Sequence, residues 1–128
     1  MKKTVFLAIG MAVCLSACRK QTFEERVAQE VKEFNEKEAP KRQNMYTMFD
    51  SMTFVPEQQT LSYYYTVEGD GEQLFPNELM KENILKGVRS SLALKSHKEH
   101  ELNLQYKYYG KSSGKVLMDV TFTPEDYN

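Results

Sequence analysis

The clearest β-strand pattern in the chain is the run Thr60-Leu61-Ser62-Tyr63-Tyr64-Tyr65-Thr66-Val67. Aromatic and β-branched residues favour strands, and alternation places Tyr63 and Tyr65 on one face of a sheet and Tyr64 on the other. A similar run, Met48 to Val55, precedes it, and the intervening Pro56-Glu57-Gln58-Gln59 is typical of a turn. Together these segments predict a β-hairpin.

A second hairpin is predicted in the C-terminal part of the chain. Apolar side chains alternate with polar ones from Leu102 to Tyr108, which places Tyr106 and Tyr108 on one face and Tyr109 on the other. The segment Gly110-Lys111-Ser112-Ser113-Gly114 is typical of a hairpin loop, and Val116 to Phe122 alternates as the final strand before Pro124.

An amphipathic helix is predicted before each hairpin. The first begins at Thr22, which forms a capping box with Glu25, and ends before Pro40. The second spans roughly Asn77 to Lys95, and Gly87 inside it is interpreted as a point of close packing against the sheet. Its apolar stripe has a spacing of four residues and consists of Met80, Ile84, Val88 and Leu92.

The order helix, hairpin, helix, hairpin predicts an α+β fold. We expect a four-stranded antiparallel sheet with both helices on one face, because clean alternation in the strands indicates one buried and one wetter face. The length fits a single domain over residues 22–128, made of two similar halves of about fifty residues each.

The N-terminus has the pattern of a signal peptide. Lys2 and Lys3 precede an apolar stretch of about 11 residues from Val5 to Leu15, whereas a membrane-spanning helix needs roughly 20. The run Leu15-Ser16-Ala17-Cys18 then resembles the lipobox of a bacterial lipoprotein. The resemblance implies removal of residues 1–17, acylation of Cys18 and a short tether over residues 18–21. The alternative is an ordinary secretory signal cleaved near Ala17.

The residues after Cys18 bear on localisation. In the common enterobacterial sorting pattern, Asp directly after the cysteine retains a lipoprotein in the inner membrane, but here that residue is Arg19. Some bacterial groups export lipoproteins to the cell surface through acidic residues at this point, whereas Lys20 and Gln21 follow here. The lipoprotein resemblance therefore implies an outer-membrane anchor that faces the periplasm.

Charge and cysteine content exclude some classes of partner and chemistry. Removing Lys2 and Lys3 from the 17 basic residues leaves 15 against 18 acidic ones, a formal charge of −3, which disfavours nucleic acid as a partner. Cys14 leaves with the signal peptide and Cys18 is used by lipid. No thiol then remains for a disulfide, a thiolate-ligated metal or a cysteine nucleophile.

The predicted domain also resembles a group of small, mostly uncharacterised lipoproteins and secreted proteins of Gram-negative bacteria. The residues that carry the likeness are Asn35, Pro40, Tyr63, Tyr65, Tyr106, Tyr108 and Gly114. Such proteins often have a cysteine before the proline, where Ala39 stands here, so any disulfide of theirs is not expected in this chain. The resemblance implies no catalytic residues.

No catalytic set, cofactor site or metal site is predicted. His97 and His100 are three residues apart, whereas the helical zinc-protease motif places its histidines four apart, so a solvated helix end is the simpler interpretation. The carboxylates of the loops and the C-terminus are expected to be solvated rather than paired for acid–base work. They are Glu68, Asp70, Glu72, Glu125 and Asp126.

Tyr64 and Tyr109 are the candidate binding residues, because alternation points both away from the predicted core, where a partner, peptide or glycan could bind. We therefore expect a non-catalytic binding or accessory module, held at the outer membrane by Cys18, with an envelope protein as its partner. The alternatives are an inhibitor of a hostile hydrolase such as lysozyme, or an envelope hydrolase with carboxylates from distant loops. The oligomeric state is open, since an unpaired sheet edge could also form a dimer.

Overall fold

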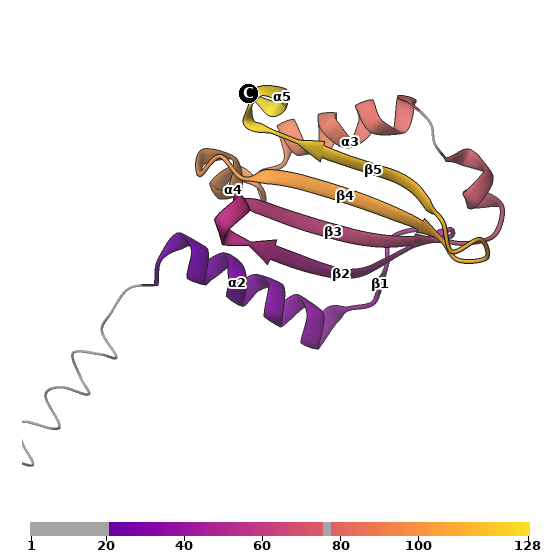
Figure 1. The fold of residues 1–128 in the computed structure, drawn as a ribbon, viewed down its shortest axis with the longest axis horizontal. Helices are drawn as coiled ribbons and strands as arrows, with labels where there is room; N and C mark the ends of the chain where they lie inside the picture. The colour runs from indigo at the N-terminus through magenta and orange to yellow at the C-terminus, as the bar shows by residue number, and fades with distance from the viewer. Residues whose placement is uncertain (1–20, 76–77) are drawn as a thin grey trace, which may run out of the picture.

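The computed structural model describes residues 21–75 and 78–128, which form a five-stranded sheet with helices on one side (Figure 1). The predicted signal peptide and Cys18 lie outside the described residues. The strands neighbour one another in chain order and are β1 (Lys41–Arg42), β2 (Thr47–Val55), β3 (Thr60–Val67), β4 (Asn103–Gly110) and β5 (Val116–Phe122).

The prediction of a four-stranded antiparallel sheet is wrong, because β3 and β4 pair in parallel. Parallel strands require a crossover connection, and residues 68–102 provide it. This connection carries α3 (Glu78–Ser90) and α4 (Lys95–Glu99) and returns the chain to the end of the sheet where β3 begins. There the Asn103 amide donates to the Gln59 carbonyl at 2.7 Å.

The fifth strand is the other difference from the predicted sheet. β1 pairs antiparallel with β2, with Lys41 opposite Phe49 and Arg42 opposite Met48. Both residues of β1 are charged and exposed, so they carry no alternating pattern from which a strand could be predicted.

The first helix, α2 (Phe23–Glu33), begins where its capping residue predicts. The Thr22 hydroxyl accepts a hydrogen bond from the Glu25 amide at 3.1 Å. The helix continues into a π-helical turn, η1 (Phe34–Glu38), and ends before Pro40. Val27 and Phe34 are buried on its inner side, so α2 packs one stripe against the sheet.

The second predicted helix is shorter than its sequence pattern indicates. α3 ends at Ser90, and a separate turn of helix, α4, follows at Lys95. The apolar stripe therefore stops at Val88, which is 2% exposed, while Leu92 is 87% exposed. The prediction that Gly87 marks close packing is also wrong, because an added Cβ there would meet no atom within 4 Å.

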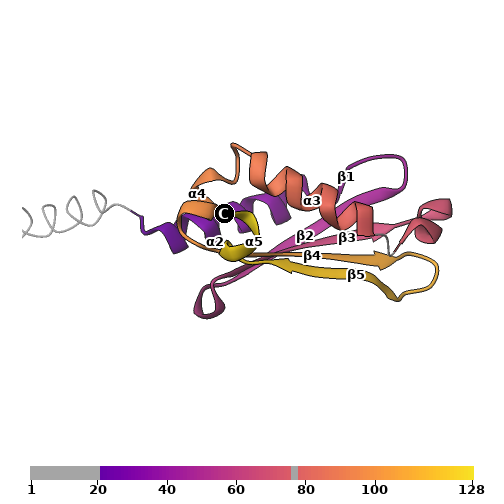
Figure 2. The ribbon, with the colours of Figure 1, turned by 90° about the horizontal axis from the view of Figure 1, so that it is seen from above.

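The core is a layer of aromatic rings between the sheet and the helices, and α2 and α3 lie on the same side of it (Figure 2). The parallel register sets Tyr63 beside Tyr106 and Tyr65 beside Tyr108, with ring centroids 4.7 and 4.5 Å apart. Stacked pairs of this kind stabilise a fold by about 0.5–1.5 kcal/mol each beyond their burial. The aligned tyrosines therefore favour this one register of the two hairpins.

Three short helical segments complete the fold: η2 (Pro56–Gln58), η3 (Gly69–Leu74) and α5 (Pro124–Tyr127). In α5 the Tyr127 hydroxyl donates to the buried Leu102 carbonyl at 2.9 Å, which ties the C-terminus to the crossover. Within residues 21–75 and 78–128, no helix is long and apolar enough to cross a membrane.

Candidate binding surfaces

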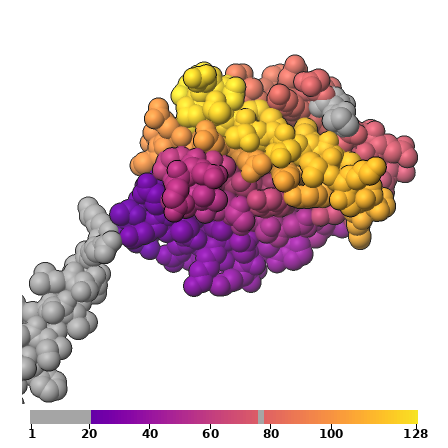
Figure 3. All heavy atoms as spheres, viewed as in Figure 1, coloured from indigo at the N-terminus to yellow at the C-terminus, as the bar shows by residue number. Residues whose placement is uncertain are grey.

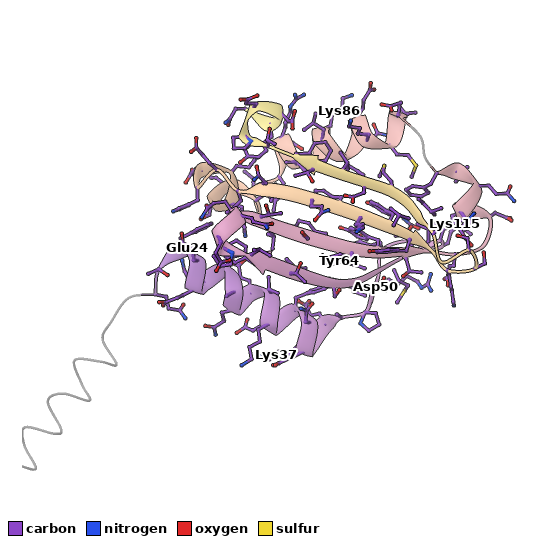
Figure 4. The ribbon with its side chains drawn as sticks, viewed as in Figure 1. Glu24, Lys37, Asp50, Tyr64, Lys86 and Lys115 are labelled. Atoms are coloured by element: carbon purple, nitrogen blue, oxygen red, sulfur yellow. The ribbon has the colours of Figure 1, made fainter. Side chains whose placement is uncertain are left out.

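The open face of the sheet is the side that no helix covers. Figure 3 shows strands accessible across this face, and Figure 4 shows Asp50 and Tyr64 on it. The parallel register places Tyr64 beside Lys107 and Thr66 beside Tyr109. Tyr64 and Tyr109 therefore share this face, as alternation predicts, and both are half-buried.

Lys107 is the register partner of Tyr64 on the neighbouring strand, and its side chain contacts Tyr109. Its ammonium is 5.6 Å from the centroid of the Tyr109 ring, within cation–π range. The adjacent Tyr109 hydroxyl, with a smaller contribution from the Asp119 carboxylate, raises the pKa of Lys107. Lys107 and Asp119 are also 3.9 Å apart, so the lysine stays charged in the middle of the face.

Side-chain hydrogen bonds run across the strands of the open face. Ser62 donates to the Gln105 carbonyl oxygen at 2.7 Å, and the Gln105 amide donates to Asp119 at 2.9 Å. At the β2 side, the hydroxyls of Thr53 and Tyr64 are 3.2 Å apart. These bonds hold the polar side chains in place, so the face offers a surface with little freedom to lose on binding.

A cleft of about 280 Å³ opens on the opposite, helix-covered side of the sheet. Its walls come from the inner face of the sheet, from α3, from Phe75 and from the turn between β1 and β2. The apolar and aromatic lining residues are Tyr65, Phe75, Met80, Ile84 and Tyr108. The polar lining residues are Gln43, Asn44, Thr47 and Asn83.

The described residues that line the cleft are all uncharged. Burial raises the pKa of Tyr108 to about 12, and burial together with the neighbouring tyrosines also raises that of Tyr65. Both hydroxyls therefore remain protonated at neutral pH, and the cleft presents neutral donors and acceptors beside apolar walls.

Three exposed apolar residues adjoin lining residues in the sequence and are called the rim. Met45, Leu74 and Leu79 are 73%, 56% and 61% exposed, and each is the sequence neighbour of a lining residue. The cleft and this rim were not apparent in the sequence, since their residues come from segments that lie far apart in the chain.

Two carboxylates tie the loops at this end of the sheet together. Glu68 is 2.7 Å from Arg42 and 3.3 Å from Lys111, and Glu72 accepts hydrogen bonds from Ser112 and Ser113. Hydrogen bonds from Arg42 lower the pKa of Glu68, and those from Ser112 lower that of Glu72. Both carboxylates remain at the surface, and in addition to the predicted solvation they join the segment around η3 to the β4–β5 loop.

The two histidines face different partners. His97 is only 8% exposed, and its Nε2 is 3.1 Å from the Glu30 carboxylate, so the prediction of a solvated helix end is wrong for this residue. His100 stacks on Phe23 with ring centroids 3.7 Å apart. Within the part of the chain that the structure describes, no three His, Cys, Asp or Glu side chains are grouped to hold a metal ion.

Comparison with protein families assigns the described domain to one family. The chain belongs to the family described as a domain of unknown function (DUF8479), which matches residues 22–118. No curated protein sequence matches the chain.

Solved structures share the fold at low sequence identity. One is a Pseudomonas aeruginosa protein thought to be secreted, with a TM-score of 0.66 at 10% identity, covering 85% of this chain and 100% of that one. Another is EpsS, a pilotin of the type 2 secretion system of Vibrio vulnificus, with a TM-score of 0.67 at 8% identity, covering 82% of this chain and 91% of that one. The Vibrio cholerae type II secretion pilotin AspS has a TM-score of 0.62 at 13% identity, covering 80% of this chain and 90% of that one.

Proposed function

We propose that this protein is a lipid-anchored, non-catalytic accessory module of the bacterial outer membrane that binds another envelope protein. The observation that carries the proposal is the fold, which spans nine-tenths or more of two type II secretion pilotins. The lipobox ending at Cys18 supports a lipid anchor, and Arg19 supports the outer membrane and its periplasmic side.

The partner is proposed to contact the open sheet face at Tyr64 and Tyr109. Aromatic side chains contribute a large share of the energy of protein interfaces, particularly when hydrogen bonds already orient them. Lys107, which contacts Tyr109, adds a charge that would favour an acidic or carbonyl-bearing group on the partner.

The proposal is tested by purifying the tagged, acylated protein from its native envelope in mild detergent and identifying stoichiometric companions by mass spectrometry. We expect one companion protein with the unaltered chain and at least about a tenfold loss with the double variant Tyr64→Ala, Tyr109→Ala. Leu92→Ala is the matched control, because Leu92 is exposed and apolar but lies off this face.

Thermal unfolding of the double variant separates loss of binding from loss of fold. A companion that is retained when both tyrosines are removed would exclude this surface. A protein with no companion at all would contradict the accessory role.

A further inference from the structure

We propose that the cleft between α3, Phe75 and the β1–β2 turn receives one large apolar side chain from an uncharged segment of the partner protein. Met45, Leu74 and Leu79 would then pack against the residues on either side of that side chain. The inference rests on the proposed function, because it assumes that the ligand is a protein.

The size of the cleft fits a single side chain. Ligand sites for drug-sized molecules measure roughly 300–1,000 Å³, so a cleft of about 280 Å³ lies at or below that range. The ring of Phe75 lies 5.1 Å from that of Tyr108 and forms one wall. An anchoring aromatic or aliphatic side chain would gain contacts with both rings.

The lining favours a peptide over a lipid chain. Gln43 and Asn83 contribute exposed amide groups to the lining. A peptide main chain can satisfy such amides with its own N–H and C=O groups, whereas an acyl chain would bury them without partners. Since the described lining carries no charge, a charged side chain entering the cleft would lose its hydration without compensation.

The rim extends the apolar contact beyond the cleft. Met45 and Met80 contribute flexible, polarisable side chains, which adapt well to partner surfaces. The hydrogen bonds from Ser112 and Ser113 to Glu72 fix η3, which ends at Leu74, directly before Phe75. The wall is therefore held in place before a partner arrives, which lowers the cost of binding.

The cleft is separate from the open sheet face and from the start of the described chain. Tyr65 and Tyr108 point into it from the side of the sheet opposite to Tyr64. The first part of α3, which lines the cleft, lies at one end of the sheet, whereas α2 begins at the other end (Figure 1). Substitutions can therefore probe the cleft and the open face independently.

Site-specific photocrosslinking in the native envelope tests the inference. Benzoylphenylalanine replaces Asn83 at the cleft, Tyr64 on the open face, or Leu92 as an exposed control outside both surfaces. We expect the Asn83 position to crosslink, at least about tenfold above Leu92, to a partner segment with an apolar residue and no charge within about two residues of it.

The outcomes distinguish this inference from the proposed function. Crosslinks at Tyr64 without crosslinks at Asn83 would overturn the cleft as a docking site and leave the accessory role standing. No protein adduct at any position would overturn both. An adduct at Asn83 to lipid, to a second copy of this chain or to a charged segment would also overturn the inference.

A binding measurement with the crosslinked segment, made as a synthetic peptide, completes the test. Because the chain contains no tryptophan, a tryptophan placed in the peptide reports binding by its fluorescence alone. We expect Met80→Lys, and separately Asn83→Arg, to weaken binding at least tenfold, while Lys81→Met on the outer side of α3 leaves it unchanged. Equal affinity for all variants with unaltered melting temperatures would overturn the inference.

Discussion

At the scale of single residues, Cys18 carries the predicted membrane attachment. Two or more acyl chains give stable anchoring, because each buried methylene contributes about 0.8 kcal/mol. No other cysteine follows it in the chain.

We therefore expect Cys18→Ser to abolish incorporation of an alkyne-tagged palmitate and to leave residues 1–17 attached, as intact mass would show. Cys14→Ser is the matched control, since Cys14 lies inside the predicted signal peptide and should not affect labelling. Labelling that persists in Cys18→Ser would refute the lipobox interpretation.

Gly87 and Gly71 differ in the space available for a side chain. Gly87 lies inside α3 with open space where a Cβ would project, whereas a Cβ on Gly71 would come within 2.6 Å of Tyr46. Glycine in a helix interior costs about 0.8–1.0 kcal/mol relative to alanine.

Gly87→Ala should accordingly raise the free energy of unfolding by about 0.5–1 kcal/mol, measured by urea denaturation. Gly71→Ala should lower it, because Tyr46 and Val67 must move. Destabilisation by Gly87→Ala would mean that α3 packs more closely at this point than the structure shows.

At the scale of elements, Glu68 and Glu72 link η3 to its neighbours. The hydrogen bonds of Glu72 lower its pKa below the ordinary value of 4.5, and a lowered pKa stabilises the folded state only while the carboxylate is ionised. This contribution is present above the unfolded pKa and is lost as the pH falls through the folded one.

Glu72→Gln should therefore reduce stability at pH 7 and make progressively less difference below about pH 4.5. Urea denaturation at pH 7 and pH 3 measures the difference in free energy of unfolding between the unaltered protein and the variant at each pH. Glu57→Gln, in the exposed η2 turn, is the control and should show little effect at either pH. A difference in free energy of unfolding for Glu72→Gln that stays constant with pH would exclude a contribution from the ionised carboxylate.

At the scale of the whole molecule, β3 is the central strand of the sheet, and β4 pairs with it. The inner faces of these two strands carry the stacked tyrosines. β1, in contrast, is a two-residue strand with exposed side chains. The free energy of local opening is therefore expected to be much higher for β3 and β4 than for β1 at this edge.

Native-state hydrogen exchange should show amides of β3 and β4 exchanging at least about a hundredfold more slowly than those of β1. The slowest amides should report the global free energy of unfolding. Uniform protection across all five strands would indicate that the edge opens only with the whole domain.

The local sequence pattern was sufficient to predict most helices and strands. Alternation predicted β3, β4 and β5 and the opposite directions of Tyr64 and Tyr65, and Thr22 marked the start of α2. The sequence pattern failed where local residues carry no signal. The two charged residues of β1 do not alternate, and the spacing of Leu92 continues the helical pattern beyond the point where α3 ends.

Local sequence was enough to predict the lipobox resemblance, the strand-forming runs and the outward direction of Tyr64 and Tyr109, because each depends on neighbouring residues or on a period of two. The parallel pairing of β3 with β4, the cleft and the Glu72 contacts became visible only in the folded chain. These features join segments tens of residues apart. Their geometry follows from how the crossover packs the aromatic layer, which no local pattern encodes.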